Sequence, residues 1–188
     1  MLVSETARKL LEKEKKLTKT TDENGWSPLH YAAFYFRQST CIVGVLLRYD
    51  ASAAYIAETE KRTALHIAAI QGHVDKMKEI VSRCPACCEL VDNRGWNALH
   101  YAVASKRIYV FEECLEIPEL GRLKTKKDDK GNTPFHLIAA VAHEKTQWRR
   151  VLYKYSDRDL YGLNKRKLSV KDIYEGNFGE IQQVIIPL

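Results

Sequence analysis

The amino-acid sequence predicts an all-α fold of stacked antiparallel helix pairs joined by β-hairpin-like turns. Three observations support this prediction: a seven-residue motif built around a Leu-His or Phe-His pair recurs four times, its copies are almost evenly spaced, and a turn-forming segment precedes each copy. The histidines of the motif, which we treat as structural markers of the repeats, are His30, His66, His100 and His136. Their spacings of 36, 34 and 36 residues indicate one supersecondary unit per copy.

Each copy of the motif follows residues that favour a tight turn. An acidic residue lies five positions before the motif in all four copies: Asp22, Glu58, Asp92 and Asp128. A glycine lies two positions before the motif in three of them: Gly25, Gly95 and Gly131. Glycine adopts positive φ without strain, and a Ser or Thr followed by Pro caps and opens a helix. Each unit is therefore predicted to run from a hairpin through a cap into a helix.

The second copy shows the rest of the unit. Gln71, Gly72 and His73 interrupt the first helix, and Val74, Met77, Ile80 and Val81 then recur at the spacing of the buried face of a second helix. A pair of short helices cannot bury its apolar surface alone, so the fold must be stabilised by stacking of neighbouring units.

This register divides the chain into six segments. We expect the outer helix of an incomplete repeat, or an N-terminal cap, at residues 1–21, four repeats at 22–57, 58–91, 92–127 and 128–163, and a degenerate repeat or C-terminal cap at 164–188. In the last segment Lys171 replaces the core Leu and Asp172 replaces the His.

The beginning of the chain has two interpretations. Residues 5–17 fall where the second helix of a repeat is expected, but its turn and first helix are absent from this chain. We favour a truncated repeat over a cap, because the apolar residues of this segment would otherwise lack a partner: Leu2, Val3, Ala7, Leu10 and Leu11. The chain also closes on the apolar segment Val184–Leu188, so we hypothesise that it is a fragment or a truncated gene product.

Taken together, these motifs resemble the ankyrin-repeat family over nearly the whole chain. The blocks ENGWSPLHYAA, NRGWNALHYAV and KDDKGNTPFHLIAA look most similar to plant ankyrin-repeat membrane proteins with a C-terminal PGG domain, which this chain lacks. The resemblance implies an ankyrin-repeat solenoid whose histidines bond the backbone of the neighbouring turn. It also implies a place on the cytosolic face of a membrane, such as the plasma membrane, and a role in defence or stress signal transduction.

Composition is that of a globular protein, with 45% hydrophobic and 29% charged residues. The longest apolar run, Ile42–Leu47, is too short for a membrane helix, and the charged N-terminus does not resemble a signal peptide. We therefore expect a soluble, cytoplasmic chain whose five cysteines are reduced.

The sequence carries no constellation typical of an enzyme, and we expect neither cofactor nor small-molecule substrate. Zinc ligands lie about 2 Å from the metal, whereas equivalent histidines on stacked helices are roughly 8–10 Å apart, so the recurrent histidines do not predict a metal site. Cys84 and Cys87 have the Cys-x-x-Cys spacing, but no second pair accompanies them. We assign them a structural role, with redox sensing or lipidation as the alternative.

The predicted partner is a protein, bound on the concave surface that hairpin tips and inner helices form in such arrays. Trp and Arg, two residue types frequent in binding hot spots, follow the turn in three repeats. The candidate residues are the positions that vary between copies: Glu23, Asn24, Trp26, Phe34, Tyr35, Arg62, Ile70, Gln71, Asn93, Arg94, Trp96, Ser105, Lys130 and Asn132.

Several alternatives stay open at these positions. The Trp rings either contact a partner or cover the adjacent hairpin. Phe36 stands where the second copy has Gly72, so the first helix is expected to run on, and Phe34 and Tyr35 are either exposed or buried under a missing upstream repeat. The repeats either bind another protein or pack against their own membrane domain or sister subunits.

The net charge of +6 and a pI near 9.0 raise a further alternative, an electrostatic binder of nucleic acid or of an acidic membrane surface. The basic residues of 149–167 are interleaved with Asp157 and Asp159, as in a solvated face. Nucleic acid is therefore not the favoured partner.

Overall fold

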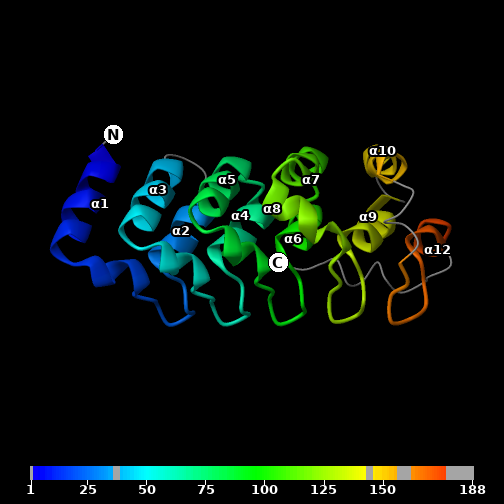
Figure 1. Ribbon diagram of the computed structural model, residues 1–188, viewed down its shortest axis with the longest axis horizontal. Coiled ribbons are helices and arrows are strands. Elements are labelled where there is room, and N and C mark those ends of the chain that lie inside the picture. Colours follow the sequence, from blue (N-terminus) through cyan, green and yellow to red (C-terminus); the bar gives the residue numbers. More distant parts are fainter. Residues whose placement is uncertain (1, 36–38, 143–145, 156–161, 177–188) are drawn as a thin grey trace. The chain divides into compact units, whose positions relative to one another are not determined.

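The computed structural model describes residues 2–35, 39–142, 146–155 and 162–176, which form two compact units, Met1–Asn93 and Arg94–Leu188 (Figure 1). In each unit short helices pair and stack, which confirms the predicted all-α class. Among the described residues, none of the helices has both the length and the apolar stretch needed to cross a bilayer.

The first unit contains two rows of helices. The outer row consists of α1 (Leu2–Lys13), α3 (Ser39–Tyr49) and α5 (Val74–Arg83), and the inner row of α2 (Pro28–Phe34) and α4 (Ala64–Gln71). Neighbours within a row pack against one another, so α1 lies against α3 in the same way as α3 lies against α5 (Figure 1). A short 3-10 turn follows each outer helix, at Lys15–Lys19, Ala51–Tyr55 and Pro85–Glu89.

The second unit repeats this arrangement. Its inner helices are α6 (Ala98–Ala104), α9 (Pro134–Ala142) and α12 (Val170–Tyr174), and its outer helices are α7 (Ile108–Leu115) and α10 (Thr146–Lys154). The short helix α8 (Pro118–Gly121) and a 3-10 turn at Arg122–Thr125 lead from α7 into the next hairpin. In this unit α9 packs against both α6 and α12.

The hairpins are closed by the acidic residue that begins each of them. In the fourth copy, Asp128 Oδ1 accepts hydrogen bonds from the backbone N–H groups of Lys130 (2.9 Å) and Asn132 (2.7 Å). Gly131 has a φ of +79°, and a Cβ at this position would lie 2.7 Å from the backbone nitrogen of Lys165 in the next hairpin. Glycine is therefore required twice, by the turn and by the close approach of the neighbouring backbone.

Each motif histidine joins the start of its own helix to another hairpin or loop. The Ser27 N–H donates to His30 Nδ1 (3.1 Å), and His30 Nε2 lies 3.0 Å from the carbonyl oxygen of Arg62. His136 repeats this arrangement with the Thr133 N–H (3.1 Å) and the carbonyl oxygen of Leu168 (3.3 Å). Because Nδ1 accepts a hydrogen bond, the proton resides on Nε2 and the imidazole is neutral.

Burial reinforces this neutral state. His30 and His136 are fully buried, and desolvation lowers the pKa of each imidazole below its ordinary value. The motif histidines therefore perform the backbone-bonding role that the ankyrin resemblance implied.

Small side chains let the inner helices pack between neighbours. In α4, Ala64, Leu65, Ile67, Ala68 and Ala69 are all buried. Because neighbouring helices cover it on several sides, this helix carries apolar residues on all of them rather than on one face. Burying a Leu or Ile side chain stabilises the fold by about 1.5–3 kcal/mol, so stacking supplies what each short helix lacks by itself.

Some sequence expectations need correction or stay open. The first helix of the motif does not run on: α2 ends at Phe34, and Tyr35 has extended backbone angles. Phe36, Val184–Leu188 and the side chains of Leu2 and Val3 lie outside the described part of the chain. The division into six segments stays a prediction, and so does the choice between truncated repeat and cap at residues 1–21.

Candidate partner-binding surface

Four aromatic side chains gather at the start of the first unit, and we call Trp26, Tyr31, Phe34 and Tyr35 the aromatic cluster. The Trp26 ring lies 5.1 Å from that of Tyr31 and 5.6 Å from that of Phe34, and Tyr35 contacts Phe34 at 5.4 Å between ring centroids. Tyr31, Phe34 and Tyr35 are 41%, 39% and 60% exposed, while Trp26 is half-buried. Mutual ring contacts thus hold an apolar surface in place in contact with solvent.

Helical periodicity explains why these rings face outward. Leu29 and Ala33 on the opposite side of α2 are buried, whereas Tyr31 and Phe34 share the remaining side. At the position of Tyr31, α4 carries Ile67, which is only 3% exposed. The same motif position is thus core in one repeat and surface in the other.

A hydrogen bond ties the cluster to its hairpin. The Tyr31 hydroxyl donates to Asp22 Oδ2 at 2.5 Å. This bond lowers the pKa of the Asp22 carboxyl and raises the pKa of the Tyr31 phenol. The Tyr31 side chain is therefore held by a hydrogen bond from its hydroxyl to Asp22 and by ring contact with Trp26.

A buried lysine fixes the other end of the same helix. Lys76 of α5 is 3% exposed, and its Nζ donates to the carbonyl oxygens of Ala33 (3.2 Å) and Tyr35. Burial lowers the pKa of Lys76 to about 8. The ammonium caps the last carbonyls of α2, so it positions Phe34 and Tyr35.

The hairpin tips of the first unit form a polar rim. Glu23, Asn24 and Asn93 are exposed. Backbone bonds connect successive tips, from the Thr59 N–H to the Asn24 oxygen (3.3 Å) and from the Asn93 N–H to the Glu60 oxygen (3.1 Å). These candidate residues are thus accessible side chains on a connected backbone.

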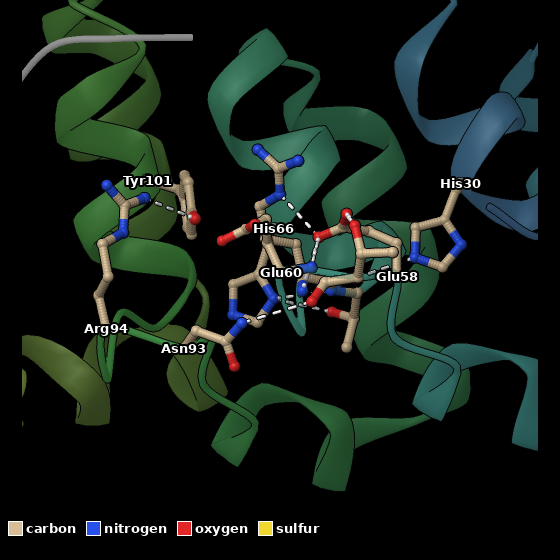
Figure 2. Close-up of polar contacts among 10 residues, drawn as sticks. His30, Glu58, Glu60, His66, Asn93, Arg94 and Tyr101 are labelled. Atoms are coloured by element: carbon tan, nitrogen blue, oxygen red, sulfur yellow. Dashed lines mark hydrogen bonds and ion pairs between the residues drawn. The ribbon is translucent and has the colours of Figure 1, made fainter. Parts of the chain in front are cut away.

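Arg62, another candidate, is committed to an ion pair. Its Nε donates to Glu58 Oε1 at 2.8 Å, and the Glu58 side chain is buried (Figure 2). Burial alone would raise the pKa of Glu58, but hydrogen bonds from Arg62 and from the backbone N–H groups of Glu60 and Arg62 hold it below its usual value. Arg62 is half-buried, so only part of its guanidinium is accessible to a partner.

Trp96, a candidate partner-binding residue, is only 3% exposed, so its ring does not form an exposed anchor. The Arg94 guanidinium lies 4.2 Å from its ring centroid, and the Tyr101 ring lies 5.4 Å away. The indole Nε1–H donates to Asp128 Oδ2 at 3.1 Å. The Trp96 ring thus covers the adjacent hairpin, which was the other interpretation of the Trp residues.

Asn132 is also buried and therefore offers no side chain to a partner. Its Nδ2 donates to Asp128 Oδ2 (3.3 Å), and its Oδ1 accepts from Asn164 Nδ2 (2.9 Å). Asn132 thus joins two successive hairpins. The remaining candidates divide into the half-buried Ile70, Gln71 and Ser105 and the exposed Arg94 and Lys130.

Sequence reasoning missed Tyr31. This residue occupies a motif position, and Tyr101 at the same position of the third copy is 1% exposed. The same residue type at the same motif position is thus core in one copy and surface in another. The seven-residue motif alone does not separate them; the one difference visible in the sequence is that no inner helix precedes the first copy in this chain.

The cysteine-rich segment lies inside the first unit. Cys84, Cys87 and Cys88 are buried, and a hydrogen bond to Cys88, together with burial, raises the pKa of the Cys87 thiol. In the described residues no group of three His, Cys, Asp or Glu side chains is arranged to hold a metal ion. Burial makes these three thiols poorly accessible to thiol reagents.

The fold and these surfaces define a helical repeat protein whose motif residues bond its own hairpins. Residues 36–119 match the family model of ankyrin repeats in three copies. Residues 36–119 therefore resemble ankyrin repeats, which are in general a protein-binding module and typically non-catalytic.

Curated relatives are distant ankyrin-repeat proteins. The chain is 28% identical over 125 residues to the target of rapamycin complex 2 subunit AVO2 of Saccharomyces cerevisiae, which covers 64% of the chain and 28% of the relative. It is 34% identical over 104 residues to the ankyrin and armadillo repeat-containing protein of Mus musculus, covering 53% of the chain and 7% of the relative. It is 30% identical over 127 residues to the ankyrin repeat domain-containing protein SAT10 of Stachybotrys chartarum, covering 68% of the chain and 6% of the relative. The chain thus matches less than a third of the length of each of these relatives.

Proposed function

We propose that this chain is a non-catalytic interaction module that binds a protein partner through the aromatic cluster of its first unit. The observation that carries the proposal is the set of three exposed, mutually packed rings on α2 and at its C-terminal end: Tyr31, Phe34 and Tyr35. Large aromatic side chains bury much area for little loss of conformational freedom, and exposed apolar patches with a polar rim mark interaction sites. Glu23 and Asn24 supply part of that rim.

The aromatic cluster is suited to act as a preformed anchor. Trp26 supports the rings from the hairpin side and Lys76 fixes the end of the helix, so binding requires little reordering of these side chains. A partner that covers the three rings removes them from water, and this burial supplies the main favourable term in its association.

The test is a quantitative pull-down from a lysate of the source organism, comparing the wild-type chain with Phe34→Ser/Tyr35→Ser. Matched controls are Tyr109→Ser and Tyr153→Ser, which remove rings that are equally exposed but lie on outer helices. Proteins retained by the wild type and by both controls, and lost by the double variant, support the proposal. Retention of all partners by a folded double variant refutes it.

A finer assignment rests on the sequence resemblance. In that hypothesis the chain is the cytosolic part of a plant defence or stress signalling protein related to membrane-anchored PGG-domain proteins. The relatives described above come from fungi and a mammal, so only the quoted sequence blocks favour it. Sequencing of the complete transcript tests it, because the hypothesis requires membrane-spanning segments downstream.

A further inference from the structure

The positive charge of this chain is concentrated in its second unit. Residues 94–188 carry 17 basic and 12 acidic residues, whereas residues 1–93 carry 13 and 12, so the second unit accounts for +5 of the net charge of +6. The excess of basic residues is therefore unevenly distributed between the two units.

Six of these basic residues lie on or directly before two adjacent hairpins. We call them the basic tip surface: Lys126, Lys127, Lys130, Lys165, Arg166 and Lys167. All six are exposed. The two hairpins are held together, because the Lys165 N–H donates to the Lys130 oxygen (3.0 Å) and Lys127 Nζ donates to the Leu163 oxygen (2.7 Å). The cations therefore occupy a defined part of the fold.

The fold withdraws one nearby carboxylate from this surface. Asp128 is buried, and its carboxylate accepts hydrogen bonds from the backbone of Lys130 and Asn132 and from the Trp96 indole. At the corresponding position of the next hairpin stands Asn164, which is uncharged and uses its Oδ1 in the same way. Asp129 is the exposed carboxylate within residues 124–132 and 162–169.

The chemistry beside the cations favours a protein ligand over a nucleic acid. Leu163, at the edge of the basic tip surface, is 50% exposed and offers an apolar contact. Residues 124–132 and 162–169 contain no aromatic side chain on which a base would stack. A segment with several carboxylates and an apolar side chain matches both features.

We propose that the basic tip surface binds an acidic segment of a protein partner, rich in Asp and Glu, with an apolar side chain of that segment on Leu163. This inference deepens the proposed protein-binding function by naming the chemistry of the partner. It places the acidic contact on the second unit, on residues different from those of the aromatic cluster.

The experiment uses the whole 188-residue chain and a fluorescein-labelled 12-residue peptide of alternating Glu and Ser with a central Leu. Its affinity is measured by fluorescence anisotropy at salt concentrations from 25 to 300 mM. Lys165→Glu/Arg166→Glu/Lys167→Glu is compared with Lys13→Glu/Lys15→Glu/Lys16→Glu, a control that changes the net charge equally at exposed positions of the first unit. Lys127→Glu/Lys130→Glu tests the neighbouring hairpin independently.

We expect both tip variants to weaken peptide binding at low salt at least about tenfold and the control less than about threefold, since each surface ion pair contributes about 0.2–1 kcal/mol. Equal losses in the tip variants and the control would show a net-charge effect and overturn the proposal. Tighter binding of a single-stranded oligonucleotide of equal charge, or of anionic vesicles, with the same sensitivity to the tip variants, overturns it in favour of those ligands.

The acidic contact and the aromatic contact can be tested independently of each other. Phe34→Ser/Tyr35→Ser should bind the acidic peptide with wild-type affinity. Failure of the peptide to bind a chain whose pull-down depends on Phe34 and Tyr35 refutes only the acidic contact. Peptide binding by a chain whose pull-down is indifferent to those rings refutes only the aromatic contact.

Discussion

Acidification should destabilise the repeats through their motif histidines. In the folded chain the Nδ1 atoms of His30 and His136 accept backbone N–H groups, and burial lowers the pKa of both rings. The unfolded chain binds the proton at its ordinary pKa of about 6.5. Below this pH the unfolded state therefore binds more protons than the folded state, and the free energy of unfolding falls as the pH falls.

The magnitude follows from proton linkage. At pH 5.5, one unit below the unfolded pKa, a histidine that stays neutral in the folded chain costs up to about 1.4 kcal/mol of stability. His30 belongs to the first unit and His136 to the second, so each unit loses up to this amount. Full stability is present above about pH 7.

Urea unfolding at pH 7.5, 6.5 and 5.5, followed by far-UV circular dichroism, measures this loss. His30→Gln and His136→Gln are the matched variants, because a Gln amide accepts the N-cap N–H and donates to a carbonyl but does not titrate. Each variant should lose less stability than the wild type between pH 7.5 and 5.5, by about 1 kcal/mol. The same pH dependence in wild type and variants would refute the assignment of a neutral, Nδ1-accepting imidazole.

Four further predictions concern the backbone, the thiols and the buried lysine. Lys61, with a φ of 59°, stands where three other hairpins have glycine, so Lys61→Gly should raise the free energy of unfolding by about 0.5–1 kcal/mol in urea titrations. Gly131→Ala should lower it by about 2–3 kcal/mol in the same assay, since the new Cβ meets the next hairpin at a φ of +79°. Cys41 is exposed and the other four cysteines are buried, so one thiol should react rapidly with Ellman's reagent and Cys41→Ser should abolish that phase; fast reaction of several thiols would contradict the structure. The lowered pKa of Lys76, about 8, means that the unfolded state binds more protons between pH 8 and 10.5, so stability should rise with pH in this window more in the wild type than in Lys76→Met.

The repeated part of the fold is predictable from the sequence because it is fixed by backbone chemistry. The acidic hairpin residues, the positive-φ glycines and the helix-capping histidines bond the main chain, and the main chain is the same in every copy. Spacing alone therefore locates the hairpins and inner helices. The end of α2 was not predictable, because its last carbonyls are capped by Lys76, which lies about forty residues further along the chain.

Exposure of the candidate side chains is less predictable, as Trp26 and Trp96 show. Both follow the turn glycine of their hairpins, but Trp96 bonds Asp128 and lies under Arg94, whereas Trp26 is half-buried. In the first unit, the acidic residue corresponding to Asp128 is Glu58, which pairs with Arg62. Burial thus depends on the neighbouring copy, and a pattern within one copy does not contain it.

The neighbours of a charged side chain also depend on the fold. Lys165, Arg166 and Lys167 follow Asp157 and Asp159 in the chain, which suggested a mixed-sign solvated face. Asp157 and Asp159 lie outside the described residues, and the fold brings the three cations beside the hairpin of Lys130. The stacking of hairpins thus brings together cations that are about 35 residues apart in the chain.

The fifth copy separates the two tasks of the motif histidine. Asp172 Oδ2 accepts the Ser169 N–H at 2.8 Å, so a carboxylate starts α12 as His30 Nδ1 starts α2. A carboxylate has no counterpart of Nε2–H, the donor that reaches the carbonyl of a following hairpin from His30, His100 and His136. A repeat with Asp at this position therefore begins its helix normally but cannot make the histidine bond to a further hairpin. Starting a helix and joining hairpins are separate requirements, and both are met by motif residues. We therefore expect specificity for a partner to reside in side chains that remain exposed, such as those of the aromatic cluster and of the hairpin tips.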